Sequence, residues 1–366
     1  MKRLSSTSCL LLAATALAAL PACESGFDRN DQIVNSLRIL GIRSHVVENT
    51  DTTDWADAQV GDTLELSALV TNPANVGVTI TWLACVPNGT DVLPPCNDAN
   101  LLKNPVSLIG MANDPSTGVL NLGTTNPVQF TVPSEVQPLL DAVLTRAYDP
   151  NNPQAANPQA ECSLFVEVPL IVILQGSDGE VFTATQNVRL SPWSQVGANA
   201  TVPQYQYYIR NANPSITGFF DNPPSRTVCA GQPLTVVCQS DADCAAFSAG
   251  TTCQPNGFCA PGTFPDGNQT ICLALDMPQD YYDCGLSGPE LDNDPDGSPN
   301  VAEQPSITWY ATAGSIGTIA RPKAGTGTDL ASETYSAFTR ATGPFTIYGV
   351  VRDGRGGETW LAQDFQ

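Results

Sequence analysis

Two stretches of the chain repeat the same series of strand signals, and this repeat constrains the fold more than any other feature. Ile80-Thr81-Trp82 and Ile307-Thr308-Trp309 match residue for residue. Each is followed by a long hairpin pattern with an Asp-Gly pair at its turn, Asp178-Gly179 in the first stretch and Asp353-Gly354 in the second. Asp-Gly is typical of tight hairpins because glycine accepts the positive φ that such turns need. The sequence therefore predicts two related β-rich units.

Segments in which apolar and polar residues alternate come before each tryptophan in the same order. A period of two is typical of half-buried strands. In the first unit the predicted strands are Ser36–Ser44, Gly61–Val70 and Val78–Cys85. In the second unit they are Asn213–Phe220, Gly231–Cys238 and Ser306–Gly314.

One helix is predicted in the first unit, over Ser134–Ala147. Ser134 and Gln137 have the spacing of a capping box. The apolar residues that follow lie on one helical face, namely Val136, Leu139, Leu140, Val143 and Leu144. We expect this helix to cover the core at one end of the unit.

Short strands, turn residues at intervals and a tryptophan in the third strand resemble an immunoglobulin-like β-sandwich. The resemblance covers residues 36–192 and 205–366. It implies a mainly β protein with two immunoglobulin-like β-sandwich domains, residues 36–200 and 201–366, with a disulfide-rich insertion in the second and one short helix in the first. The first unit lacks cysteines at both positions of the usual inter-sheet bridge. A fold of this kind does not specify an activity.

The N-terminal residues have the features of a secretory signal. Met1-Lys2-Arg3 is basic, and the apolar run Leu10–Leu20 is shorter than the ~20 residues of a membrane span. Leu20-Pro21-Ala22-Cys23 resembles the lipobox of bacterial lipoproteins, which implies a signal peptide at residues 1–22, lipid on Cys23 and a tether at residues 23–35. In that family Glu24 at the next position implies the outer membrane. An ordinary cleaved signal with a chance cysteine is the alternative.

Ten cysteines remain beyond Cys9 of the signal and the lipidated Cys23. They are Cys85, Cys96, Cys162, Cys229, Cys238, Cys244, Cys253, Cys259, Cys272 and Cys284. An even number in an exported chain favours disulfides. Zinc would need CxxC pairs or histidines, and the sequence beyond the signal has no CxxC and a single histidine.

A cysteine-rich insertion is predicted over about residues 239–305. Cys238, Cys244, Cys253 and Cys259, spaced C-x5-C-x8-C-x5-C, lie at its start, where apolar residues are few and disulfides must supply the stability. Four cysteines allow three connectivities, of which we prefer Cys238–Cys253 with Cys244–Cys259. A Cys85–Cys96 bond would close a short loop in the first unit, and the order of the remaining pairs is open.

This segment also resembles small cysteine repeats in secreted proteins of myxobacteria. Together with the lipobox and the two Ile-Thr-Trp units, the whole chain resembles the uncharacterised outer-membrane surface lipoproteins of those bacteria. The resemblance implies a location and an architecture.

The stretch Leu291–Glu303, LDNDPDGSPNVAE, matches a calcium-loop pattern. The candidate ligands are Asp292, Asp294, Asp296, Ser298, Asn300 and Glu303. This spacing wraps oxygen ligands around a hard cation, so we expect a structural Ca²⁺. The alternative is an acidic turn on the surface of a very acidic protein.

Composition and motifs narrow the function classes. A formal net charge of −21 repels phosphate backbones, so we expect no nucleic-acid partner. His45 is the only histidine available as a catalytic base, and we place it in a surface loop after the first strand. Paired carboxylates alone could still support a glycosidase.

We therefore predict a non-enzymatic, lipid-anchored cell-surface protein with a binding or structural role. Its partners would be the membrane, through the lipid, and a surface protein or a polysaccharide. The alternative is a carbohydrate-binding accessory protein or a carboxylate-based glycan-active enzyme. Four aromatic residues between the units could stack on sugars or pack the contact between domains, namely Trp193, Tyr205, Tyr207 and Tyr208.

Overall fold

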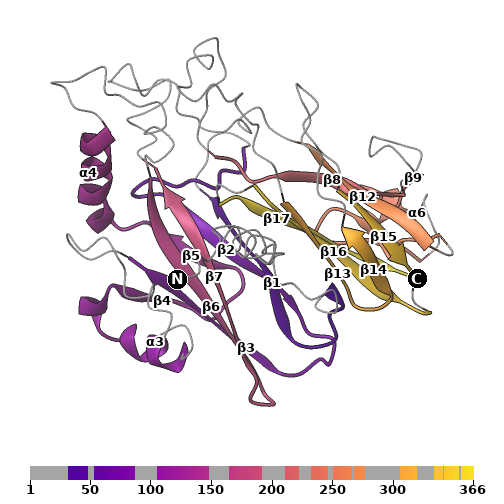
Figure 1. Cartoon of the computed structure of the whole chain (residues 1–366), viewed down its shortest axis with the longest axis horizontal. Helices are drawn as coiled ribbons and strands as arrows, with labels where there is room; N and C mark the ends of the chain where they lie inside the picture. Colours follow the sequence, from indigo (N-terminus) through magenta and orange to yellow (C-terminus); the bar gives the residue numbers. More distant parts are fainter. Residues whose placement is uncertain are drawn as a thin grey trace, which may run out of the picture.

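The computed structural model describes the chain in twelve segments: residues 32–47, 53–86, 105–147, 165–191, 211–221, 232–245, 250–265, 268–276, 306–319, 334–340, 342–353 and 356–366. These segments form two β-sandwiches, one from the first half of the sequence and one from the second (Figure 1). The predicted mainly β, sandwich-type fold is confirmed. Within the described segments, no helix is both long and apolar enough to cross a bilayer.

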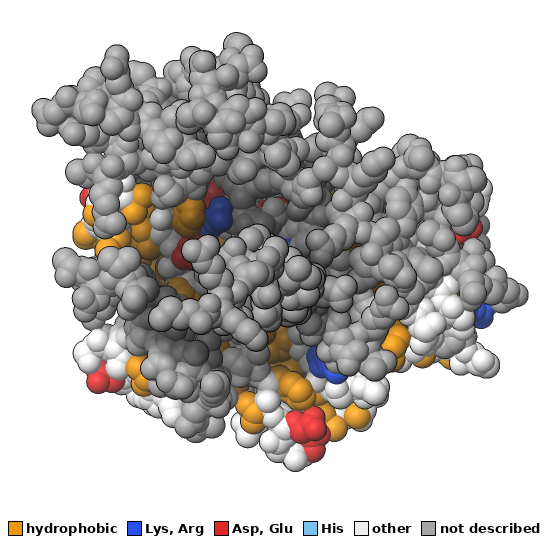
Figure 2. All heavy atoms as spheres, viewed as in Figure 1, with side chains coloured by type: hydrophobic (Ala, Val, Ile, Leu, Met, Phe, Trp, Pro, Cys, Tyr) orange, Lys and Arg blue, Asp and Glu red, His pale blue; other side chains and the backbone are white. Residues whose placement is uncertain are grey.

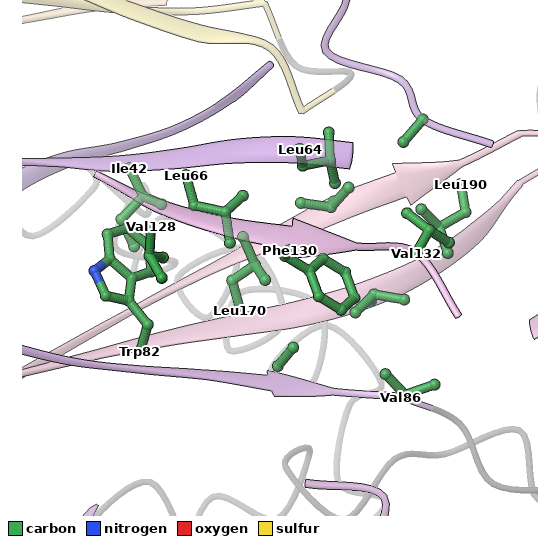
Figure 3. Close-up of a cluster of buried hydrophobic side chains, with 14 of the residues drawn as sticks. Ile42, Leu64, Leu66, Trp82, Val86, Val128, Phe130, Val132, Leu170 and Leu190 are labelled. Carbon is green, nitrogen blue, oxygen red and sulfur yellow. The ribbon is translucent and has the colours of Figure 1, made fainter. Parts of the chain in front are cut away.

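The first sandwich packs one antiparallel sheet on another. One sheet has the strand order β1–β2–β5 and the other β4–β3–β6–β7. The strands are β1 Arg38–Val46, β2 Thr63–Thr71, β3 Val78–Cys85, β4 Val119–Gly123, β5 Val128–Thr131, β6 Val166–Gly176 and β7 Val181–Leu190. Side chains from both sheets meet between them, with Trp82 fully buried beside Leu66 and Leu170 (Figure 3).

The second sandwich has the same layered plan with a larger sheet. Its sheets have the orders β13–β16–β17 and β14–β15–β12–β8–β9. The strands are β8 Ser215–Asp221, β9 Gln232–Pro233, β12 Asn268–Asp276, β13 Ser306–Ala311, β14 Ser315–Ile319, β15 Thr334–Thr339, β16 Phe345–Arg352 and β17 Glu358–Phe365. Trp309 is fully buried and lies 5.4 Å from Phe219, ring centroid to centroid.

The two sandwiches bear out the internal repeat. Trp82 and Trp309 occupy matching positions, each on a strand that pairs with the first strand of a long hairpin, β6–β7 or β16–β17. At the first hairpin turn Gly179 has φ +90°, as the Asp-Gly pattern predicts. At the second, the Asp353 amide donates to the Gly357 carbonyl over 3.2 Å, so the connection spans five residues rather than a tight Asp-Gly turn.

The cysteine-rich insertion is shorter than predicted. Its first part holds a short helix and a small hairpin, α6 Asp241–Ala245 with β10 Thr252–Cys253 and β11 Cys259–Ala260. Its later part is not an appendage, because β12 pairs with both β8 and β15 inside the large sheet. Phe264, between the two parts, is fully buried against Phe338 and Phe365. Apolar residues in the middle of the expected insertion therefore complete the core of the second sandwich.

The predicted strand Gly231–Cys238 is reduced to β9, Gln232–Pro233, and an isolated bridge at Val237. Pro233 has no amide to donate to a ladder, and Cys238 joins the disulfide-bonded part of the insertion. Val237 is 65% exposed whereas the neighbours Leu234 and Thr235 are both buried, so burial does not alternate along this segment as it would in a sandwich strand.

The predicted helix is present as a 3-10 turn, η5 Ser134–Val136, followed by α4 Gln137–Ala147. Val136 and Leu140 are buried as expected, but the capping box is not formed. Pro133 is the N-cap, and Gln137 hydrogen-bonds forward to Asp141.

The first sandwich also has two short helical elements that were not predicted, α3 Pro105–Met111 and η4 Pro115–Thr117. Leu108 of α3 is fully buried and packs on the outer face of the sheet, against Leu83 and Ile171. Seven residues are too few to give a periodic helical signal.

Candidate functional site

Most sequence-predicted site residues lie outside the described segments. These are the lipidation site Cys23 and the calcium ligands Asp292, Asp294, Asp296, Ser298, Asn300 and Glu303. The same holds for Cys96, Cys162, Cys229 and Cys284, and for the aromatic group Trp193, Tyr205, Tyr207 and Tyr208. Lipidation and calcium binding stay predictions.

The cysteines of the insertion pair as Cys238–Cys253 and Cys244–Cys259, the connectivity that we preferred from the sequence. Three of their sulfurs gather within 4.8 Å, but all are disulfide-bonded and offer no thiolate to a metal. Cys85 and Cys272 are also disulfide-bonded. The insertion is fixed to β17 as well, because Gln363 donates from Nε2 to the Cys259 carbonyl over 2.9 Å.

His45 lies inside β1, opposite Glu65 of β2, and not in a loop as predicted. The strand continues to Val46, which belongs to the first core. Among the described residues no serine or cysteine forms a hydrogen bond with this imidazole.

A junction between the two sandwiches brings together residues that no sequence motif identified. Its apolar part consists of Leu40 from the first sandwich with Tyr310 and Val350 from the second, together with Val34. Val34 precedes β1, and its amide donates to the Ala311 carbonyl of β13 over 2.8 Å. It is fully buried, so this end of the expected tether packs on the second sandwich. Leu40 is the extra residue of a β-bulge in β1, since Ile39 pairs with Val70 and Gly41 with the next residue, Leu69. A bulge re-aims the side chains on either side of it. Here it lets Leu40 face the second sandwich while Ile42 faces the first core.

Glu358, the first residue of β17, is the polar centre of this junction. Its side chain is 3% exposed and accepts two hydrogen bonds from Arg352, Nε to Oε2 at 2.9 Å and Nη2 to Oε1 at 3.1 Å. Oε1 also accepts from the backbone amide of Ile42 at 3.1 Å, and Arg352 Nη2 donates to the Leu40 carbonyl at 3.1 Å. One ion pair of the second sandwich thus holds the edge strand of the first.

Burial raises the pKa of Glu358 to about 7. The Arg352 charge and the hydrogen bonds from Ile42 and Arg352 oppose this rise, and the nearby Asp353 charge adds to it. Desolvation outweighs the ion pair because the carboxylate has lost nearly all its contact with water. The group therefore changes its charge near neutral pH.

A second set of polar contacts lies beside Glu358 and also joins the sandwiches. Asn213 donates from Nδ2 to the Ser44 carbonyl at 2.8 Å and accepts at Oδ1 from the Glu358 amide at 2.9 Å. Asn211 donates from Nδ2 to Asp353 at 2.9 Å, and its amide donates to Asp57 at 3.2 Å. All of these residues are buried, and buried polar groups favour one arrangement because leaving any of them unpaired costs about 1–3 kcal/mol.

A cleft of about 370 Å³ opens beside the junction, between β1, β7 and the β16–β17 hairpin. Its charged lining residues are Glu167, Arg189, Arg352 and Glu358. Glu167 and Arg189 lie opposite each other on β6 and β7, and the Glu167 carboxylate accepts from Asn187 Nδ2 at 2.8 Å. The hairpin borders the cleft where Gln186 Nε2 donates to the Gly356 carbonyl at 2.9 Å.

The sequence motifs did not predict this site, and a local sequence pattern indicates only one part of it. Arg352 and Glu358 flank the second hairpin connection and pair in register, which their spacing could have indicated. Their contact with Ile42 joins positions 316 residues apart, and no local pattern encodes it.

No known protein family and no curated protein matches the sequence. Among solved structures, the chain is similar to fibronectin(III)-like modules of Clostridium thermocellum CbhA, at 8% identity over 90% of this chain and 92% of that one, with a TM-score of 0.20. It is also similar to SGBP-B of the Bacteroides ovatus mixed-linkage glucan utilization locus, in complex with a mixed-linkage heptasaccharide, at 13% identity over 91% and 48% of the two chains, with a TM-score of 0.16. TM-scores of this size do not establish a shared topology. The assignment of the fold rests on the strand pairings and cores described above.

Proposed function

We propose that this protein is a non-enzymatic, lipid-anchored cell-surface protein that presents two β-sandwiches in one fixed arrangement and binds a partner outside the membrane. The partner is a surface protein or a polysaccharide. Lipid on Cys23 would hold the chain to the outer membrane.

The observation that supports a binding or structural role is the junction, where buried polar contacts join the two sandwiches. A flexible pair of modules would be joined by a linker alone, whereas here Glu358, Arg352 and Asn213 fix the first sandwich to the second. Contacts between domains of one chain are often weak enough to allow motion. Separation would break the hydrogen bonds from the Ile42 amide to Glu358 and from Arg352 to the Leu40 carbonyl. This opposes such motion because each buried group would have to be resolvated or left unpaired.

A non-enzymatic role is supported by the engagement of the junction's charged groups in structural contacts. Each nitrogen of the Arg352 guanidinium donates to a protein oxygen, Nε and Nη2 to Glu358 and Nη1 to Thr308 at 3.4 Å. A general acid or base needs to reach a substrate. Glu358 is instead turned inward onto the Ile42 amide.

Crosslinking on intact cells tests the binding role. We expect the wild-type protein to capture a specific surface protein or polysaccharide, and a variant that loosens the junction, Glu358→Ala, to capture less of it at equal surface abundance. Turnover of any captured glycan by the purified protein would contradict the non-enzymatic assignment and favour the glycan-active alternative. Capture of nothing beyond bulk lipid would contradict a binding role.

A further inference from the structure

We propose that the cleft between β1, β7 and the β16–β17 hairpin binds a carboxylate-bearing sugar, and that Arg189 recognises the carboxylate. This ligand deepens the binding role proposed above and rests on it. A uronic-acid unit of an acidic polysaccharide has the required chemistry, a planar carboxylate on a ring that carries hydroxyls.

Arg189 provides the recognition group. Its guanidinium carbon lies 4.2 Å from the centroid of the Phe165 ring, which holds the planar group by a cation–π contact. Within the described segments its nitrogens donate no hydrogen bond and form no ion pair. Arg352, on the other side of the cleft, is fully engaged by Glu358 and Leu40. A guanidinium placed on an aromatic ring with its N–H groups available matches a carboxylate, which it binds through two parallel hydrogen bonds.

The charge around the cleft favours an anion in a protein that otherwise repels anions. The chain has 36 acidic and 15 basic residues. Among the described side chains on the face shown in Figure 2, those of lysine and arginine are few and lie apart. In the cleft, by contrast, Arg189 and Arg352 balance Glu167 and Glu358. Burial raises the pKa of Glu358 to about 7, which weakens its repulsion of an anion at neutral pH.

The remaining lining fits a sugar better than a peptide. Glu167 and Thr185 are exposed and can hydrogen-bond hydroxyl groups, and Ile39 and Ala184 offer apolar contact to ring C–H groups. A peptide would most readily add as a strand to a free sheet edge. Along β1 that route is obstructed because Glu358 already holds the Ile42 amide. A volume of about 370 Å³ lies in the range of small-molecule sites, at roughly 300–1,000 Å³.

Titration of full-length protein, purified in detergent, tests this assignment with D-glucuronate and D-glucose as matched probes. We expect saturable binding of glucuronate and at least about tenfold weaker binding of glucose, because glucose has no carboxylate to accept the two charge-assisted hydrogen bonds from the guanidinium. Arg189→Gln should lower the affinity for glucuronate at least about tenfold, and Arg189→Lys, which keeps the charge but not the planar fork, should give an intermediate loss. Arg340→Gln, which changes an arginine of the second sandwich that contacts Phe264, should bind as the wild type does.

Three results would overturn the assignment. They are no saturable glucuronate binding, equal affinity of wild type and Arg189→Gln with matching thermal unfolding curves, and equally tight binding of inorganic phosphate or of a free peptide carboxylate. Each of these would leave the proposed anchored binding role standing with a different ligand. Loss of lipid from Cys23 or hydrolysis of a uronate-containing chain would instead contradict the proposed function itself.

Discussion

The backbone amide of Ile42 donates a 3.1 Å hydrogen bond to Oε1 of Glu358, although 316 residues separate them along the chain. The contact joins an edge strand of the first sandwich to the hairpin of the second. The carboxylate is buried and paired with Arg352, which fixes its position. Strand β1 therefore has to lie where its Ile42 amide can reach this fixed acceptor. The relative placement of the sandwiches therefore depends on few atoms.

Replacing Gly41 by alanine should disrupt this contact. The added Cβ would overlap Glu358 Oε1 and crowd Trp360 and Val350, both at 3.3 Å. Overpacking of this kind costs typically about 1–3 kcal/mol. Denaturant unfolding measures the loss. The control is Gly110→Ala in α3, whose Cβ meets nothing within 4 Å, and it should leave the unfolding free energy unchanged or slightly raised. Equal stability of both variants would contradict the close approach.

Stability should fall as the pH rises from about 4.5 to about 7, through the titration of Glu358. Its pKa is raised from 4.5 to about 7, so the folded state binds more protons than the unfolded state inside this window. The contribution of the protonated Glu358 to the free energy of unfolding is fully present below about pH 4.5 and is lost as the pH passes through about 7. Its size is on the order of 3 kcal/mol.

Glu358→Gln should remove that slope from the pH dependence of the unfolding free energy, whatever its effect on stability at one pH. Glu135→Gln, which changes an exposed glutamate of η5, should keep the wild-type slope. A Glu358→Gln protein with the wild-type slope would show that other groups cause it.

Replacing either of the matching tryptophans by phenylalanine should lower stability less than their complete burial suggests. The Nε1 atoms of Trp82 and Trp309 are buried and, among the described residues, have no hydrogen-bond partner. Phenylalanine removes the unsatisfied N–H along with some volume, whereas alanine leaves a large cavity at about 3–5 kcal/mol. Thermal unfolding should rank Trp309→Phe well above Trp309→Ala, and the same order should hold at Trp82. Equal losses at either position would contradict this assignment of the indole N–H.

Calcium at millimolar concentration should protect the wild-type chain from proteolysis near Leu291–Glu303 and raise its unfolding temperature. Extracellular-type loops bind at roughly 10⁻⁴–10⁻³ M. The double variant Asp292→Ala/Asp296→Ala should lose both effects, and magnesium should not replace calcium. If calcium changes neither property of the wild type, the stretch is an acidic turn.

Local patterns predicted the parts of the fold that local physics decides. Strand β3 has the predicted bounds Val78–Cys85, because a run of β-branched residues marks its start and an apolar run continues to its end. The turn at Gly179 follows from backbone freedom in the same way. The pairing Cys244–Cys259 was only the preferred one of three connectivities that the spacing left open. Strand β12 was assigned to the insertion because its cysteine-rich neighbours masked a short apolar run.

The candidate site was beyond such patterns. In the sequence nothing distinguishes three residues from other polar residues of hairpins, namely Arg352, Glu358 and Arg189. They form a site only because β1 of the first sandwich packs beside the hairpin of the second. The bulge at Leu40 contributes to this, since one extra residue changes the face on which later side chains point. Contacts between units depend on tertiary placement, which a single sequence does not display.

Metabolic labelling of growing cells with a fatty-acid analogue shows whether this is a lipid-anchored surface protein. We expect label to enter the wild-type protein and the protein to fractionate with the outer membrane. Cys23→Ala should take up no label and should be released or mislocalised. Cys9→Ala, which changes a cysteine inside the signal, serves as the control and should label normally. Full labelling of Cys23→Ala, or an unlabelled wild-type protein free of the membrane, would contradict the account.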